Sequence, residues 1–146
     1  MLDAKTYNIE TGDWERAVAD YDRLEADALR QYLSLPQVFR DCYDQLVLFP
    51  IQAMANLYRM YYAQAKNHQL AARKDSEANY WADEVVRYFR QDSLLMLHYN
   101  RDIAGGKWNG MMTQKHIGYK TWNDNFPCDI LPDIKRIDSQ TEGGFV

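Results

Sequence analysis

This sequence has few cysteines and no long apolar run. Its two cysteines, Cys42 and Cys128, are too few for a disulfide scaffold or for a zinc site built on cysteine. No stretch approaches the roughly 18 consecutive apolar residues that a membrane span needs. The first residues also lack the basic start and apolar core of a signal peptide. The sequence therefore predicts no membrane partner, and no export signal is visible in it.

An excess of positive charge is missing too. The 146 residues include 17 basic and 21 acidic side chains, and the resulting net charge of −4 argues against nucleic acid as a partner. With 26% charged and 47% hydrophobic residues, the chain has the balance of a folded globular protein, and its length fits one domain. Aromatic residues reach 14%, which suits a core, a protein interface or a surface that contacts sugars.

Motifs for catalysis and metal binding are lacking as well. The sequence has no G-x-S-x-G elbow and no phosphate-binding loop. His98 and His116 do not have the spacing of a zinc motif, and His68 falls on an apolar helical face, where a packed imidazole is more usual than a ligand. We therefore predict no catalytic residue, no metal and no cofactor in this chain.

Glycine is nearly absent from the first two thirds of the chain, because only Gly12 precedes residue 105 and six glycines follow. The distribution predicts a helical part followed by an irregular part. The expected fold class is all-α, a bundle of about three long helices followed by an irregular aromatic-rich loop and an extended tail. The expected helices cover 13–34, 35–73 and 76–104. The expected domain division is a helical-bundle module over 1–136, with its loop at 105–132, and a flexible tail or linker over 137–146.

Apolar residues recur every three or four positions in each expected helix, as in a helix with one buried face. Asp13 is the expected N-cap of the first helix, and Ser34 with Gln37 is expected to form a capping box for the second. Pro50 interrupts the second helix without changing the phase of the pattern, so it predicts a kink. The apolar positions of this second helix are Phe39, Tyr43, Leu46, Pro50, Met54, Leu57, Tyr61, Ala65, His68 and Ala72.

The third expected helix starts after a cap at Asp75 or Ser76 and stops at the glycines 105 and 106. Asp92 lies on its apolar face, between Phe89 and Leu95. A carboxylate in such a place must be hydrogen-bonded or paired, so we expect Asp92 to be a buried structural acceptor. The carboxylate pairs Asp83–Glu84 and Asp41–Asp44 are expected on solvated faces, and Asp92–Asp102 is the third pair considered.

The segment after the third helix is rich in large rings beside amide and basic groups, a mixture that can meet the apolar face and hydroxyl edge of a sugar. The alternative is a loop whose rings fill gaps at the end of the bundle, and on the residues alone this alternative is favoured. The candidate sugar-contact or interface residues are Lys107, Trp108, Asn109, His116, Tyr119 and Trp122.

The same segment carries a family resemblance. The stretch AGGKWNGMMTQKHIGYKTW (104–122) resembles a phrase typical of glycoside hydrolase family 115, the xylan α-glucuronidases. DQLVLFPIQAMANLYRMYYAQAKN (44–67), ADEVVRYFRQDSLL (82–95) and the pair Tyr99-Asn100 fit the same family in order, so the resemblance covers about residues 7–135. Gly110 departs from it, because a bulkier residue is expected there.

The resemblance implies that this chain corresponds to the helical bundle of such an enzyme, between a catalytic barrel and a β-sandwich. The catalytic and glucuronate-binding groups of the family are expected in the barrel, so no catalytic residue is carried over. The implied role is a non-catalytic scaffold and interface whose partners are the remaining domains of a parent glycoside hydrolase and a second subunit. The parent family implies a periplasmic or secreted location. The alternatives are an independent module that binds a xylan-derived saccharide and an all-α protein-interaction module.

Overall fold

The computed structural model describes residues 2–106, 117 and 129–138. All regular secondary structure of the described residues is helical, and these residues form no strand. This confirms the expected all-α class. The α-helices are α1 (Asp13–Ser34), α2 (Gln37–Tyr43), α3 (Phe49–Ala72) and α4 (Ala78–Leu97). Two π-helical turns, η1 (Asp44–Leu48) and η2 (His98–Asp102), and a 3₁₀ turn, η3 (Ile103–Gly106), complete the order.

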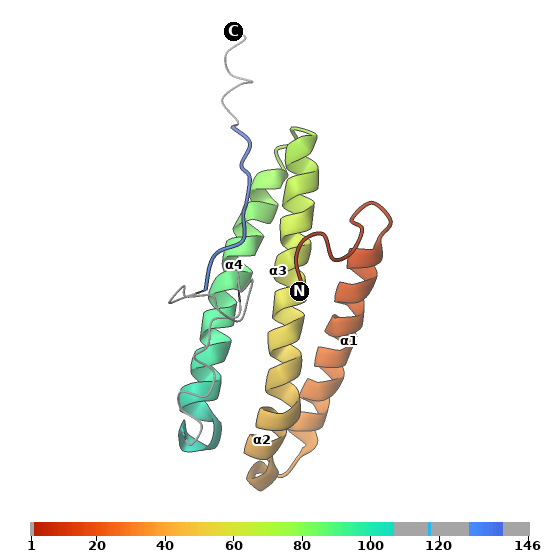
Figure 1. Ribbon diagram of the computed structural model, residues 1–146. Helices are drawn as coiled ribbons and strands as arrows, with labels where there is room; N and C mark the ends of the chain where they lie inside the picture. The colour runs from red at the N-terminus through yellow and green to blue at the C-terminus, as the bar shows by residue number, and fades with distance from the viewer. Residues whose placement is uncertain (1, 107–116, 118–128, 139–146) are drawn as a thin grey trace.

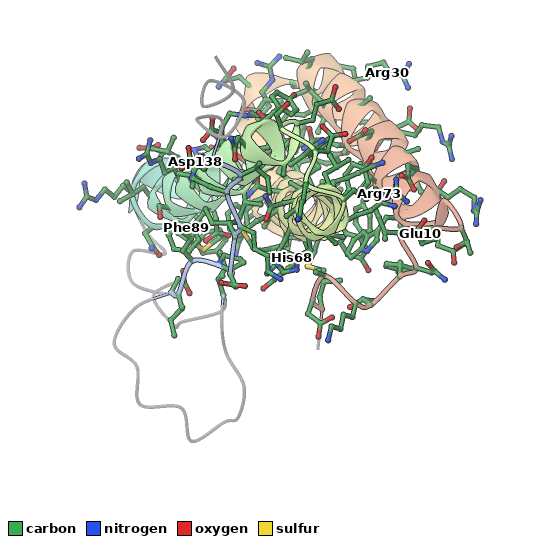
Figure 2. All side chains as sticks on the ribbon, turned by 90° about the horizontal axis from the view of Figure 1, so that it is seen from above. Glu10, Arg30, His68, Arg73, Phe89 and Asp138 are labelled. Carbon is green, nitrogen blue, oxygen red and sulfur yellow. The ribbon has the colours of Figure 1, made fainter. Side chains whose placement is uncertain are left out.

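The three long helices lie side by side and antiparallel, with α3 in the middle (Figure 1). α3 packs against α4 along most of its length and against α1 on its other side, whereas α1 and α4 have little contact with each other. The view down the helices shows the same order, with α1 and α4 on opposite flanks of α3 (Figure 2). Hollows lined by residues of α1, α3 and α4 form a channel between α1 and α4, with α3 as its floor.

The first helix has the predicted bounds, but its caps differ from the prediction. Gly12 is the N-cap, with a φ of 80° that favours glycine, and Asp13 is the first helical residue. The Asp13 carboxylate instead bonds the Thr11 hydroxyl and the Arg16 guanidinium. The capping box is also wrong, because the Ser34 hydroxyl donates to the carbonyl of Gln31 at 2.7 Å and leaves the next helix uncapped by a side chain.

The second predicted helix is continuous from α2 through η1 to α3. Pro50 has no N–H to donate back to Leu46, and the turn before it widens, so that the Phe49 N–H donates to the carbonyl of Asp44 five residues back. The helix therefore departs from α geometry at the place where the kink was predicted. The wide turn contains one residue more than an α-helical turn. It therefore changes which side chains of the following helix, α3, face the core.

The core forms where α3 meets α4 and falls into two clusters. One contains Phe49, Leu95, Tyr99 and Ile103; the other contains Met60, Ala63, Val85 and Ile117. Four of the apolar positions predicted to face the core from the third helix are buried: Ala78, Val85, Leu95 and Tyr99. The face predicted for the second helix is wrong in its first half, because Phe39, Leu46, Pro50 and Met54 are exposed. The α-helical part of the third helix ends at Leu97, and η2 continues it to Asp102. Ile103 is extended, with a ψ of 130°, so the helix stops before the glycines at which its end was predicted, and the separate 3₁₀ turn η3 follows.

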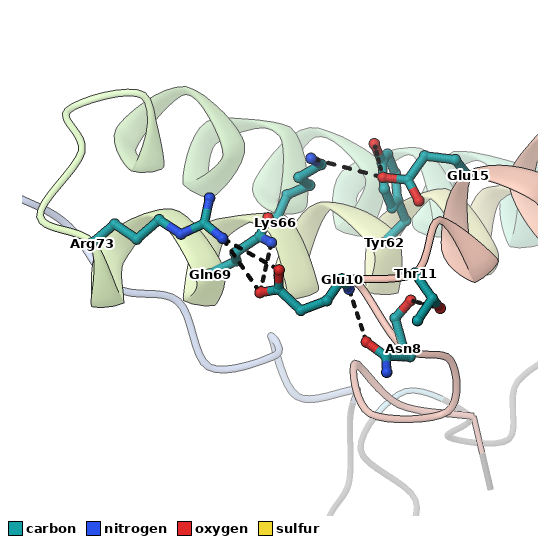
Figure 3. Close-up of polar contacts among 8 residues, drawn as sticks. All are labelled: Asn8, Glu10, Thr11, Glu15, Tyr62, Lys66, Gln69 and Arg73. Atoms are coloured by element: carbon teal, nitrogen blue, oxygen red, sulfur yellow. Dashed lines mark hydrogen bonds and ion pairs between the residues drawn. The ribbon is translucent and has the colours of Figure 1, made fainter.

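The segment before α1 folds back along α3 (Figure 3). The indole of Trp14 is fully buried and donates to the carbonyl of Ala4 at 3.1 Å. Glu10 accepts from Gln69 at 2.9 Å and pairs with Arg73 at 3.3 Å. Further along, the Tyr62 hydroxyl donates to Glu15 at 3.4 Å, and burial together with this carboxylate raises the pKa of Tyr62 to about 12.

An extended segment, residues 129–138, runs along the seam between α3 and α4 (Figure 1). Asn67 of α3 pairs with both backbone groups of Lys135, and Asn79 of α4 pairs with both backbone groups of Ile137. The domain boundary predicted between 136 and 137 therefore falls inside an attached segment. Residues 139–146 of the predicted tail lie outside the described residues.

Candidate functional site

Between residues 107 and 128, the aromatic-rich loop that the sequence singled out is described only at Ile117. The candidates Lys107, Trp108, Asn109, His116, Tyr119 and Trp122 lie outside the described residues. Ile117, between them, is fully buried against Met60 and Val85. Its N–H donates to the Asp129 carboxylate at 2.9 Å, and its carbonyl accepts from Ile130 at 3.1 Å. The middle of the segment is therefore anchored on the core and tied to the extended segment that follows.

Asp92 lies where the sequence predicted it, in the interior of α4 with 1% of its surface exposed. The pKa of the Tyr61 phenol on α3 is raised, mainly because the ring is partly buried. The negative charges of Asp3, Asp129 and Asp92 raise this pKa further. Asp92 and Asp102 do not form the considered carboxylate pair, because ten residues along a helix separate them by about 15 Å. Asp102 is exposed instead and faces His98.

A second carboxylate, Asp44, meets a histidine between the two π-helical turns. Asp44 is the first residue of η1 and His98 the first of η2, and the His98 Nε2 lies 2.7 Å from an oxygen of Asp44. The other ring nitrogen, Nδ1, lies 3.4 Å from Asp102 in the same turn. π-helical turns inside α-helices occur often at functional sites. Here they bring into contact two side chains that are 54 residues apart.

The electrostatics of this cluster favour a protonated imidazole. Burial by itself lowers the pKa of His98, but the hydrogen bond and charge of Asp44, followed by those of Asp102, outweigh it and raise the pKa above its ordinary value. Asp44 is only 5% exposed, so its negative charge interacts with the ring through little solvent. The pair can hold a proton and fix the position of the two turns relative to each other.

The cluster borders the channel between α1 and α4. A hollow of about 360 Å³ opens beside Asp44 and His98. Its other lining residues are Tyr32, Leu48, Gln52, Gln91, Leu94 and Leu95. A smaller hollow of about 200 Å³ shares Gln52, Gln91 and Leu95 with it and extends the channel to an ion pair between Arg59 and Glu25.

The channel is lined by charged, amide, aromatic and aliphatic side chains. Both ring nitrogens of His98 face carboxylates, so neither is directed at a substrate. No serine, threonine or cysteine lines either hollow among the described residues. Within the same residues, no group of three or more His, Cys, Asp and Glu side chains could hold a metal ion, and no helix is long and apolar enough to cross a membrane.

Sequence reasoning missed the Asp44–His98 pair. Asp44 was expected on a solvated face beside Arg40, but it is buried, and the Arg40 guanidinium instead bonds the carbonyls of Leu33 and Leu35. The available signal was Pro50, whose missing N–H disrupts the helical turn before it. His68 behaved as expected of a hydrogen-bonded imidazole, 2.8 Å from the carbonyl of Asp133.

Comparison of the sequence with protein-family models found no match, and comparison with curated protein sequences found no significant match.

Proposed function

We propose that this chain is a non-catalytic helical module of a glycoside hydrolase resembling the xylan α-glucuronidases of family 115. In this role it is a scaffold, and it provides an interface to the catalytic barrel or to a second subunit. The family part of the proposal rests on the resemblance of 104–122 and the stretches upstream of it. The module part rests on an exposed apolar surface.

The observation that carries the proposal is the stripe formed by Val38, Phe39, Leu46 and Met54, called here the α2 stripe. These side chains are 80%, 58%, 67% and 40% exposed, respectively. They follow one another along α2, η1 and the start of α3, on the side of the helix opposite to the core residues Leu48, Phe49 and Asn56.

A helix that is apolar on two faces is typical of a position with neighbours on both sides. Contiguous exposed apolar surface in a folded protein marks an interaction site more often than chance. Leu29 and Leu33 at the end of α1 and Leu97 at the end of α4 are exposed at the same end of the molecule (Figure 1). Each such side chain gains about 1.5–3 kcal/mol when a partner buries it fully.

The experiment compares self-association of the chain with that of two double variants. Phe39→Lys with Leu46→Lys places charge on the α2 stripe, while Leu24→Lys with Tyr80→Lys places it on side chains of similar exposure elsewhere. Sedimentation velocity is expected to show a concentration-dependent dimer or larger species for the parent chain and for the control. The stripe variant is expected to be monomeric and to bind less of a hydrophobic dye.

Two results would overturn the proposal. If the parent chain is monomeric at all concentrations and binds no hydrophobic dye, it has no exposed apolar surface available to a partner. Release of glucuronic acid from glucuronoxylan by the chain alone would show that it is a catalyst and not a module. Unchanged circular dichroism in both variants shows that the comparison reports the surface and not the fold.

A further inference from the structure

The extended segment 129–138 is held by side chains in the way that a sheet holds an edge strand. Asn67 donates to the Lys135 carbonyl at 2.6 Å and accepts the Lys135 N–H at 2.8 Å. Asn79 does the same for Ile137 at 2.8 and 2.7 Å, and Gln64 and His68 both reach the carbonyl of Asp133. The bonded residues are 133, 135 and 137, which is the alternation of an extended strand.

The other backbone edge of this segment is open. In an extended strand, successive residues direct their N–H and C=O groups to opposite edges. Ile134 and Arg136 therefore direct theirs away from the amides of α3, and within the described part of the chain these groups have no hydrogen-bond partner. The segment stays in register, because Ile134 packs on the core cluster of Met60 and Val85. An ordered strand with a free edge is a template for another strand.

A basic groove lies beside that edge. It has a volume of about 600 Å³, and its lining includes three arginines, Arg87 and Arg90 of α4 and Arg136 of the segment, against one carboxylate, Asp83. Arg136 pairs with Asp83 at 3.0 Å, and Arg87 pairs with Glu84. Arg90 is exposed and has no ion-pair partner among the described residues. This is a local excess of positive charge in a chain whose net charge is −4.

We propose that an extended acidic segment of a partner protein adds to the free edge at Ile134 and Arg136. The main-chain groups of the two open residues supply affinity, as in other cases of strand addition to an exposed edge. Acidic side chains at alternate positions of the partner enter the groove and pair with Arg90 and with its neighbouring guanidinium groups. A second copy of this chain fits less well, because its own segment would bring two basic residues, Lys135 and Arg136, and one acidic residue, Asp133, to a basic groove.

The test uses the whole chain and a fluorescein-labelled octapeptide in which glutamate and valine alternate. Fluorescence anisotropy is expected to show saturable binding. Arg90→Glu is expected to weaken this binding at least about tenfold, because it reverses a charge in the groove. Arg30→Glu is the matched control, since Arg30 is an exposed arginine on α1, on the flank away from α4 (Figure 2), and it should change the affinity less than about twofold.

Strand addition is separated from simple charge attraction by the peptide backbone. The same peptide with every second amide N-methylated keeps its charge but cannot form the ladder, and it is expected to bind at least about tenfold more weakly. In the bound state, the amide hydrogens of Ile134 and Arg136 should exchange more slowly with solvent. Equal binding of the N-methylated peptide, unchanged exchange at both amides, or no anisotropy change up to about 1 mM peptide would each overturn the proposal.

Discussion

The two ends of this bundle handle polar and apolar groups in opposite ways. At the end where α3 turns into α4, the buried amides of Asn67 and Gln64 are hydrogen-bonded to backbone groups of the extended segment. The side chain of Ile134, in the same segment, packs on the core. At the end formed by α2 and the π-helical turns, large apolar side chains such as Phe39 and Leu46 are exposed while the carboxylate of Asp44 is buried.

This difference indicates which end is complete within the chain. Burial of polar groups with hydrogen bonds and of apolar groups in contact is what a finished protein surface shows. Around the extended segment, the α3–α4 end meets both conditions, apart from the exposed ring of Tyr80. The α2 end meets neither fully, and it is therefore the end at which we expect neighbouring protein. Each prediction below tests this contrast, starting with the largest expected effect on stability.

Among the polar side chains, Asn67→Ala should give the largest loss. Asn67 is fully buried and makes three hydrogen bonds, to the Ala78 carbonyl and to both backbone groups of Lys135. Its removal leaves buried backbone groups without partners, which should lower the free energy of unfolding by about 3 kcal/mol in a urea titration. Asn79→Ala removes two bonds at a less buried position and should cost about half as much. Equal and small losses, below about 0.5 kcal/mol, would show that the α3–α4 end does not depend on these amides.

The Asp44–His98 pair should couple the two π-helical turns. A double-mutant cycle with Asp44→Asn and His98→Gln is expected to give an interaction energy of about 2 kcal/mol at pH 6, because one partner is buried and the other charged. Arg73 and Glu10 provide the control, since they lie 3.3 Å apart and their side chains are 59% and 60% exposed. That exposed pair should couple by less than about 0.5 kcal/mol. If the two cycles agree, burial of Asp44 adds nothing to its interaction with the ring.

The same pair should make stability depend on pH. The folded state raises the pKa of His98 above the value of about 6.5 expected in the unfolded chain. The stabilisation is therefore complete below about pH 6 and is lost as pH rises through the raised pKa. Urea titrations from pH 6 to pH 8.5 should show this decline in the parent chain and a flatter profile in Asp44→Asn. A decline that persists unchanged in His98→Gln would assign it to another group.

Much of the fold follows from local sequence signals. Gly12 and the sequence Leu35-Pro36 bracket α1, so its bounds were predicted correctly. The start of the third helix was predicted within two residues, because the Asp75 carboxylate accepts the N–H of Glu77 just before the helix. Burial of Asp92 followed from its place between apolar neighbours.

The errors have a common physical cause in α2, η1 and α3. The apolar pattern there marks two faces, and periodicity alone does not say which of them meets the core. The wide turn η1 then shifts the register, so the side chain that reaches the interior is Asp44 rather than Leu46. Contacts such as Asp44–His98, or Asn67 with the backbone of Lys135, join residues far apart in sequence without any spacing motif. Only the packed chain reveals them.

Phe39→Ser should change the stability of the chain least, although Phe39 is one of its largest apolar residues. Its ring is 58% exposed, and no core cluster includes it, so the free energy of unfolding should change by less than about 0.5 kcal/mol. Phe49→Ser, at the buried face of the same continuous helix, removes a ring that packs on Tyr99 at 4.7 Å between centroids and should cost about 3–5 kcal/mol. Urea unfolding of both variants measures how the two faces of one helix differ. Similar losses would mean that the α2 stripe is already covered by the chain itself, and the proposed interface would have to lie elsewhere.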